Sequence, residues 1–295
     1  MLPYEVRDGV HVLFLQPNPV KPRGGVVVLD SWLIAEIATT LTAIQGEKPA
    51  GFVLASASTR VFVAGADLAE IDALDDASLD LYLKRGAEAF AMIPALGCPT
   101  AAASHGAALG GGLEIAMHCD ALIGALPAEG GKPWSIGLPE AGLCICPGWG
   151  GTQMLPARIL PALAIERTAT GQPWSCHEAP QCLFDVRAEV GSGAEGAIAA
   201  AIRWVKTQDS STGAYQSKSA PRRAISPRHA TAIAPVCEEL TKTVGTTKHG
   251  AACLDAVRVG LTHGWDAAIA SERAHLVKLR HTEEARAKLD GFLKK

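Results

Sequence analysis

Several features that mark other classes of protein are absent from this sequence of 295 residues. The formal net charge is only −3, so the chain as a whole is not drawn toward nucleic acid or an anionic membrane surface. No apolar run is long enough to span a bilayer, and the first residues lack the basic-then-apolar pattern of a signal peptide. We therefore expect a cytoplasmic protein that acts on small molecules and binds neither nucleic acid nor a membrane.

Signatures of metal sites and disulfide frameworks are also missing. The eight cysteines are irregularly spaced, and the one close pair, Cys144 and Cys146, has a single intervening residue and no matching second pair. The nine histidines show neither His-x-x-x-His nor His-Glu-x-x-His spacing. We expect buried thiols, no disulfide framework and no bound metal.

What the sequence does contain is a hydrophobic content of 48%, enough to bury one large core or two modest ones. Short apolar runs alternate with patterns of helical period, which indicates an α/β fold. Asp30 or Ser31 is a plausible cap for the first helix. The predicted strands are residues 10–15, 51–55, 60–63, 100–103 and 121–124, and the predicted helices are residues 32–45, 75–92 and 194–206.

A change in composition after the alanine-rich helix predicts the domain organisation. Residues 207–229 are polar, punctuated by Ser and Pro, and partly basic. The basic stretch from Lys218 to His229 could contact phosphates or nucleic acid, but no aromatic series accompanies it, so a solvated linker is the preferred interpretation. We predict a core with the active site over residues 1–206 and a helical C-terminal region over 230–295. Its last segment is expected to form an amphipathic helix that carries Leu276, Leu279, Leu289 and Phe292.

Two glutamates stand in glycine-bearing segments. Three glycines precede Leu113 and Glu114, and this pattern predicts a turn that opens a helix, whose N-terminus offers unpaired N–H donors. A tight packing turn with a solvated Glu114 fits the same motif. Glu140 follows a proline and precedes a second glycine cluster, and alone it reads as an exposed loop acid. His105, before the first turn, is expected to be a packed histidine and not a base.

The joint occurrence of these segments favours an active site. The chain resembles the crotonase, or enoyl-CoA hydratase/isomerase, superfamily over roughly residues 5–205. The resemblance rests on AGADL at residues 64–68, GAALGGGLE at 106–114, LPE at 138–140 running to GGTQ at 150–153, and TGQPW at 170–174 with Ala179. Residues 136–156 and 283–295 look most like the hydratase portion of multifunctional fatty-acid oxidation enzymes. No Gly-x-Gly-x-x-Gly follows a strand, so a dehydrogenase half is not expected here.

The resemblance implies a spiral of ββα repeats with a helical C-terminal region, and an acyl-CoA substrate. It implies that the backbone N–H groups of Ala66 and Gly111 form an oxyanion hole, that Glu114 activates a water, and that Glu140 serves the Cα proton. No cofactor is implied beyond the coenzyme A of the substrate. Substrate-binding positions are expected at Ala64, Gly65, Asp67, Leu68, Gly110, Pro139, Gly148 and Trp149.

Two departures from the family pattern affect the substrate site. Residues 124–135 form a longer, Gly- and Pro-rich connection, which either folds over the pocket or points outward. Trp149 stands where the family usually has a smaller or different residue. It could reduce the room for an acyl chain, although packing against the core is the favoured role.

The leading hypothesis is an enoyl-CoA hydratase, because both Glu114 and Glu140 are retained. A Δ3-Δ2-enoyl-CoA isomerase, which can manage with one acid, and a non-catalytic acyl-CoA-binding subunit are the alternatives. A homo-oligomer, trimer or hexamer, or a complex with a separate dehydrogenase or thiolase, is implied.

Overall fold

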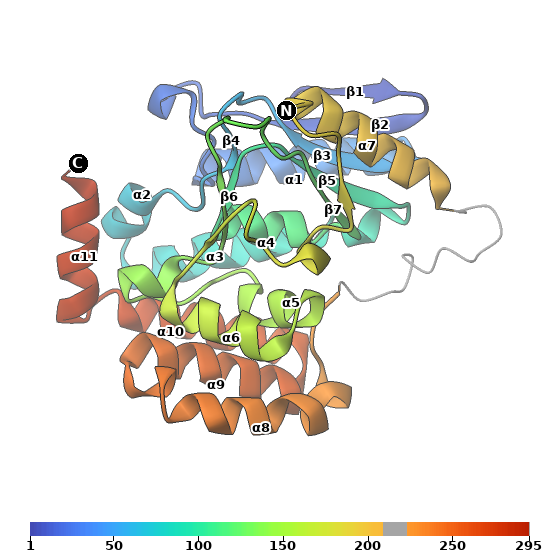
Figure 1. Cartoon of the computed structure of the whole chain (residues 1–295). Coiled ribbons are helices and arrows are strands. Elements are labelled where there is room, and N and C mark those ends of the chain that lie inside the picture. Colours follow the sequence, from blue (N-terminus) through green and yellow to red (C-terminus); the bar gives the residue numbers. More distant parts are fainter. Residues whose placement is uncertain (209–222, 295) are drawn as a thin grey trace.

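In the computed structural model, which describes residues 1–208 and 223–294, two sheets of mainly parallel strands form the centre of the fold (Figure 1). One sheet has six strands in the order β1-β2-β3-β5-β7-β10, and the other has four in the order β4-β6-β8-β9. Only the β1–β2 and β8–β9 pairs are antiparallel. The strands are β1 Tyr4–Arg7, β2 Val10–Leu15, β3 Phe52–Ser56, β4 Val61–Val63, β5 Thr100–Ser104, β6 Ala107–Leu109, β7 Ala121–Gly124, β8 Ser135–Gly137, β9 Trp174–Ser175 and β10 Val186–Arg187.

The chain alternates between the two sheets as it advances. β3, β5 and β7 enter the larger sheet, while β4, β6 and β8, which follow each of them, enter the smaller one. A helical segment follows each pair, so the predicted spiral of ββα units is confirmed. The α-helices are α1 Ser31–Gly46, α2 Leu68–Ala73, α3 Asp76–Ala91, α4 Gly111–Met117, α5 Gly151–Arg158, α6 Pro161–Thr170, α7 Gly193–Thr207, α8 Ala230–Thr241, α9 Lys248–His263, α10 Trp265–Leu279 and α11 Glu283–Leu293.

Both faces of the larger sheet are buried, which explains why its central strands read as continuous apolar runs. On β3, Val53 and Ala55 pack with α7 on one face, while Phe52 and Leu54 enter the main core on the other. The main core also takes up side chains of α1 and α3. Each predicted strand and helix of this region lies within one residue of its expected ends, and Asp30 caps α1 by accepting from the Leu33 N–H at 2.8 Å.

The C-terminal helices α8, α9 and α10 lie against α5 and α6, whereas α11 lies against α2 (Figure 1). Side chains of α8 and α9 form a third hydrophobic cluster with α6 and the 145–146 segment. The prediction of one terminal amphipathic helix was wrong: Leu276 and Leu279 belong to α10, whereas Leu289 and Phe292 belong to α11. The helix is interrupted between Leu279 and Glu283, where the Thr282 side chain caps α11 by accepting from the Ala285 N–H.

The predicted linker lies mostly outside the described residues, which resume at Arg223, and the Lys218 and Arg222 positions fall in the part not described. In its described part, Ile225 is buried and donates its N–H to the Gln153 carbonyl at 3.0 Å. The domain limits at 206 and 230 remain predictions. No helix of the described residues has the length and apolar character needed to cross a membrane.

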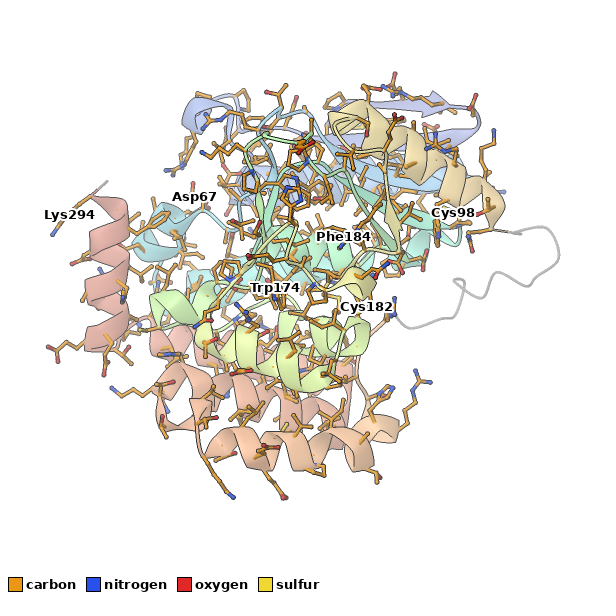
Figure 2. The ribbon with its side chains drawn as sticks, viewed as in Figure 1. Asp67, Cys98, Trp174, Cys182, Phe184 and Lys294 are labelled. Carbon is orange, nitrogen blue, oxygen red and sulfur yellow. The ribbon has the colours of Figure 1, made fainter. Side chains whose placement is uncertain are left out.

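No disulfide joins the eight cysteines, all of which lie in the described part of the chain. Most are buried, as expected for core thiols. Cys98 is buried, whereas Cys182 is exposed. Both residues are labelled in Figure 2. Cys144 and Cys146 are close in the sequence, but the thiol of Cys146 lies near that of Cys253 in α9, with the two sulfur atoms 4.0 Å apart.

Candidate active site

A cavity of about 670 Å³ opens beside the ends of β4 and β6. Its wall combines the turn at residues 64–69, the start of α4, the 3₁₀ turn η3 (Glu140–Leu143), and side chains of α10 and α11. All twelve residues predicted for the site, including both glutamates, lie on this wall. The fold thus gathers three motifs that are far apart in the sequence.

The turn after β4 presents backbone to the cavity. Gly65 has a φ of +106°, and a Cβ there would lie 3.2 Å from the Leu109 carbonyl oxygen, so glycine suits both the conformation and the close approach. The Gly65 carbonyl and the Asp67 N–H both pair with Leu29, on either side of Ala66. The N–H of Ala66 itself donates to no other described residue, and Ala66 lines the cavity.

The second turn brings a similar donor to the same wall. Gly110 has a φ of +53° and precedes α4, whose first residue is Gly111. A Cβ on Gly110 would lie 2.5 Å from Glu140 Oε1, so the absence of a side chain lets this carboxyl approach the turn. Among the described residues, the Gly111 N–H finds no acceptor. The N–H groups of Ala66 and Gly111 are therefore two donors that the chain leaves available at the cavity.

Glu114 is buried one turn into α4, with 1% of its surface exposed, so it is not the solvated residue that the motif also allowed. Its Oε1 accepts the N–H groups of Trp149 and Gly151, each at 2.8 Å. Burial, and then the charges of Glu140 and Glu272, raise the pKa of Glu114 well above its ordinary value, while the two amide bonds oppose the shift. Burial and the neighbouring charges make the Glu114 carboxylate a stronger base, whereas the two amides stabilise its ionised form.

Glu140 begins η3 and lines the cavity, so it is not a freely exposed loop acid. Its Oε2 atom is buried, and no described residue forms a hydrogen bond with it. Burial, with a smaller contribution from the charge of Glu272, raises the pKa of Glu140 to about 8. The cavity thus presents two carboxyls whose pKa values are both raised, one with a free oxygen and one that accepts two amides.

Sequence reasoning missed several residues of the site. Arg23 lines the cavity and donates to both carboxylate oxygens of Asp67, at 2.8 and 2.6 Å. Leu276 and Phe292 close the wall from the C-terminal helices. Glu272 of α10 is fully buried against Gly150 and Thr152, and no motif surrounds it in the sequence.

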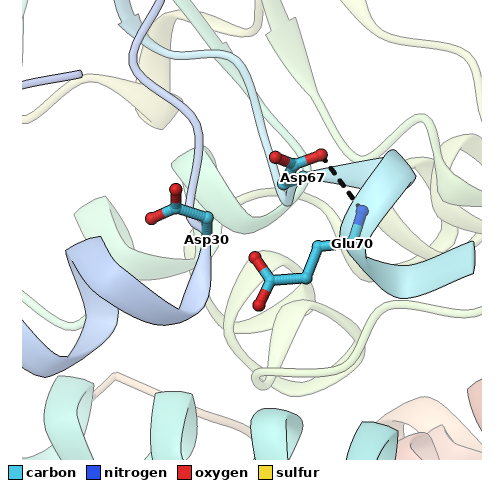
Figure 3. Close-up of side chains that lie close together, drawn as sticks. All are labelled: Asp30, Asp67 and Glu70. Carbon is cyan, nitrogen blue, oxygen red and sulfur yellow. Dashed lines mark hydrogen bonds between the residues drawn. The ribbon is translucent and has the colours of Figure 1, made fainter. Parts of the chain in front are cut away.

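Asp30, Asp67 and Glu70 lie close together beside the cavity (Figure 3), with one oxygen of each within 4.8 Å of the others. Each carboxylate has protein donors. Asp30 and Asp67 cap α1 and α2, Asp67 also pairs with Arg23, and Glu70 accepts the Ser31 N–H at 3.1 Å. Helix capping and one ion pair account for this group.

The two departures from the family pattern are Trp149 and the 125–135 connection. Trp149 is 2% exposed and donates Nε1–H to the Leu83 carbonyl at 2.9 Å, while its ring packs against Tyr82 and Phe90. It therefore packs in the core and also borders the cavity. No residue of the 125–135 connection lines the cavity. His105 is a packed histidine whose Nε2 lies 2.8 Å from the Ser58 carbonyl oxygen.

The sequence is similar to those of curated proteins named as enoyl-CoA hydratases or as subunits of fatty acid oxidation complexes. A probable enoyl-CoA hydratase of Bacillus subtilis (strain 168) is 38% identical over 154 residues, covering 51% of this chain and 57% of that protein. Fatty acid oxidation complex subunit alpha of Shewanella amazonensis is 32% identical over 262 residues, covering 86% of this chain and 36% of that protein. The chain thus spans only 36% to 57% of the length of these two curated relatives.

Solved structures share the fold. Pseudomonas aeruginosa OdaA matches with a TM-score of 0.66 at 19% identity, over 100% of this chain and 99% of that one. An enoyl-CoA hydratase from Mycobacterium avium subsp. paratuberculosis K-10 matches with a TM-score of 0.64 at 18% identity, over 99% and 95%. The sequence model of the family described as enoyl-CoA hydratase/isomerase matches residues 26–252. With that match over most of its length and the ββα spiral of its fold, the chain belongs to the enoyl-CoA hydratase/isomerase family, the crotonase superfamily.

Proposed function

We propose that the protein is an enoyl-CoA hydratase, which adds water across the trans-2 double bond of an enoyl-CoA thioester. The observation that carries this proposal is the placement of two carboxyls, Glu114 and Glu140, on the wall of one cavity beside two unused backbone donors. Hydration needs a base and an acid at the same time, and the pair supplies both.

The backbone donors are suited to the thioester carbonyl. As water attacks Cβ, the electron pair of the double bond moves toward the carbonyl oxygen and forms an enolate. The N–H groups of Ala66 and Gly111 would bind this oxygen as its charge grows. Losing one such donor in other enzymes costs about 3–4 kcal/mol of transition-state stabilisation.

The carboxyls divide the proton transfers. Glu114 accepts two amide N–H groups and acts as the base, taking a proton from water while the oxygen bonds to Cβ. Both carboxyls have raised pKa values, so the pair retains a proton near neutral pH, and the unpartnered Oε2 of Glu140 is the atom suited to deliver it to Cα. One proton enters the pair and one leaves it, so exchange with solvent restores the starting state. No cofactor is required beyond the coenzyme A of the substrate.

The direct test follows the loss of the conjugated enoyl-thioester absorbance with crotonyl-CoA and a longer trans-2-enoyl-CoA. We expect Glu114→Gln and Glu140→Gln each to lower kcat by about 10²- to 10⁴-fold, the usual range for losing a general acid or base. Glu129→Gln, at an exposed position that does not line the cavity, is the matched control and should keep wild-type activity.

The same assay separates the alternatives. Turnover of a 3-enoyl-CoA without hydration of the trans-2 isomer would make the protein an isomerase. Binding of acyl-CoA with no turnover of either substrate would make it a non-catalytic binding subunit. Either result would overturn the proposal.

We further propose that the enzyme works in the cytoplasm as a trimer or hexamer, or in a complex with a separate dehydrogenase or thiolase. The support is the similarity to a relative whose name describes it as one subunit of a fatty acid oxidation complex. Light scattering coupled to size-exclusion chromatography checks the proposal, and a monomer at micromolar concentration that binds neither enzyme would contradict it.

A further inference from the structure

Glu272 is a buried acid that the proposed chemistry does not use. It lies on α10, is 0% exposed, and does not line the cavity. Its Oε2 accepts the Gly150 N–H at 2.7 Å, and its Oε1 accepts the Thr152 N–H at 3.0 Å and the Thr152 hydroxyl at 2.5 Å. No salt bridge reaches it from the described residues.

The donors to Glu272 alternate with the donors to Glu114. The N–H groups of Trp149 and Gly151 point to Glu114, whereas those of Gly150 and Thr152 point to Glu272. Two carboxylates therefore hold one short segment, residues 149–152, from opposite sides. This segment leads into α5, whose first N–H groups have no partners within the helix.

A second contact from α10 fixes the same segment. Gly150 has a φ of +102°, and a Cβ there would lie 2.3 Å from the ring of Trp265, the first residue of α10. The segment thus meets α10 through an aromatic ring as well as through the Glu272 carboxylate. These two contacts from α10 lie next to the amides that bind Glu114.

A buried glutamate at position 272 is poorly suited to a role that is limited to stabilising the fold. Burying a carboxylate without a basic partner is costly, and burial raises the pKa of Glu272 to about 7 even though three hydrogen bonds oppose the shift. An acid at this position is more readily explained by the geometry that it imposes on the segment.

We propose that Glu272 is a positioning residue of the active site: it holds residues 149–152 so that the Trp149 and Gly151 amides remain directed at Glu114. This inference rests on the proposed function, in which Glu114 is the base. Glu272 touches neither substrate nor reacting atoms in this account. A displaced segment would leave Glu114 present but misdirected, and a shift of about 1 Å at a catalytic group can cost about 100-fold in rate.

The test compares Glu272→Gln with wild type and with Glu238→Gln, an exposed control on α8. The amide of glutamine accepts through only one oxygen and turns an N–H toward a donor. We expect kcat for a trans-2-enoyl-CoA to fall by about 10- to 100-fold with KM within about threefold of wild type. Hydrogen exchange measured by mass spectrometry should become faster in the peptide that contains residues 149–152 and stay unchanged in the β-sheets.

A second pair of variants keeps the acid and changes its partner. Thr152→Val removes the hydroxyl donor, and Thr152→Ser restores it. The serine variant should recover most of the kcat that the valine variant loses. Wild-type kcat and wild-type exchange in Glu272→Gln would overturn the proposal, as would faster exchange throughout the fold, which would indicate a purely structural residue. If wild-type protein hydrates no enoyl-CoA, the proposed function fails, whereas the exchange comparison still decides whether Glu272 holds the segment.

Discussion

Glu140 shows how a single residue sets the conditions under which the site works. The turn at Gly110 leaves room for its carboxyl, and its Oε2 has no partner among the described residues. Burial raises the pKa of Glu140 to about 8. A carboxyl with a raised pKa binds a proton more tightly in the folded chain than in the unfolded chain, so both activity and stability should depend on pH in a defined direction.

The proposed mechanism requires the acid form of Glu140, which is present below its raised pKa. We expect kcat for hydration to decline as the pH rises through about 8. Steady-state rates with saturating crotonyl-CoA between pH 6 and 10, about two units on either side of the pKa, measure this decline. A kcat that rises through the same range would contradict the assignment of Glu140 as the acid.

For stability, the folded state binds more protons than the unfolded state between the ordinary glutamate range and the raised pKa. The free energy of unfolding should therefore fall as the pH rises through that window, and Glu140→Gln should remove this part of the fall. Thermal denaturation at pH 6 and pH 9, conditions chosen about the raised pKa, should show the glutamine variant gaining stability relative to wild type at the higher pH. An equal difference at both values would argue against a raised pKa.

At the level of elements, the site depends on how closely α4 approaches β4. A Cβ on Gly112 would lie 2.2 Å from the Val63 carbonyl oxygen, a backbone atom that cannot move aside easily. This contact places Gly111 and Glu114 on the cavity wall. Glycine at this position is therefore a condition for the active site as well as for packing.

We predict that Gly112→Ala lowers the free energy of unfolding by about 1–3 kcal/mol, the usual cost of overpacking a core. Gly46→Ala is the matched control, because a Cβ at this α1 position meets no atom within 4 Å. It should be neutral or stabilising by less than about 1 kcal/mol, since alanine favours helix. Urea denaturation of the two variants measures the difference, and equal stabilities would contradict the close approach.

Helices and strands whose apolar residues recur at a regular spacing were predictable from the sequence. A helix whose end is set by tertiary contacts was not. The strands and helices of the core follow from apolar spacing, because buried faces impose that spacing. The break between α10 and α11 was missed, since the intervening Arg280 and His281 are compatible with a continuing helix. In the structure, Arg280 donates to the carbonyls of Ile71, in α2, and of Leu74, just after α2, and Thr282 caps the next helix.

On the scale of the whole molecule, the C-terminal helices complete a site whose motifs lie in the first 150 residues or so. Three short motifs predicted the cavity wall, because each glycine turn is a local requirement of the backbone. Glu272 had no such signal. A single acid in an amphipathic helix reads as a solvent-facing charge, and only the packing of α10 on the 149–152 segment buries it.

Arg280 fastens the C-terminal helices to the N-terminal part of the cavity wall. Its side chain is buried and donates to the carbonyls of Ile71 and Leu74 at 2.7 and 2.6 Å, and to Asp76 at 2.6 Å. Arg280→Met should lower the free energy of unfolding by about 1–3 kcal/mol, because a buried carbonyl loses its donor. It should also raise KM for an acyl-CoA, since Ile71 lines the cavity.

Arg280→Lys keeps the charge but presents its donors from a single nitrogen and not from a planar fork, so it should fall between wild type and Arg280→Met. Chemical denaturation and steady-state kinetics on the same preparations measure both effects. A methionine variant with wild-type stability and KM would show that α10 is held in place by other contacts.

The central proposal for the whole molecule is that water adds to the double bond through Glu114. To test this proposal directly, crotonyl-CoA is incubated with the enzyme in water enriched in oxygen-18, and the mass of the product is measured by mass spectrometry. We expect one heavy oxygen on the β-carbon of a 3-hydroxyacyl-CoA with wild-type protein, and almost none with Glu114→Gln. Unlabelled substrate after prolonged incubation with wild-type protein, or equal labelling by the two proteins, would contradict it.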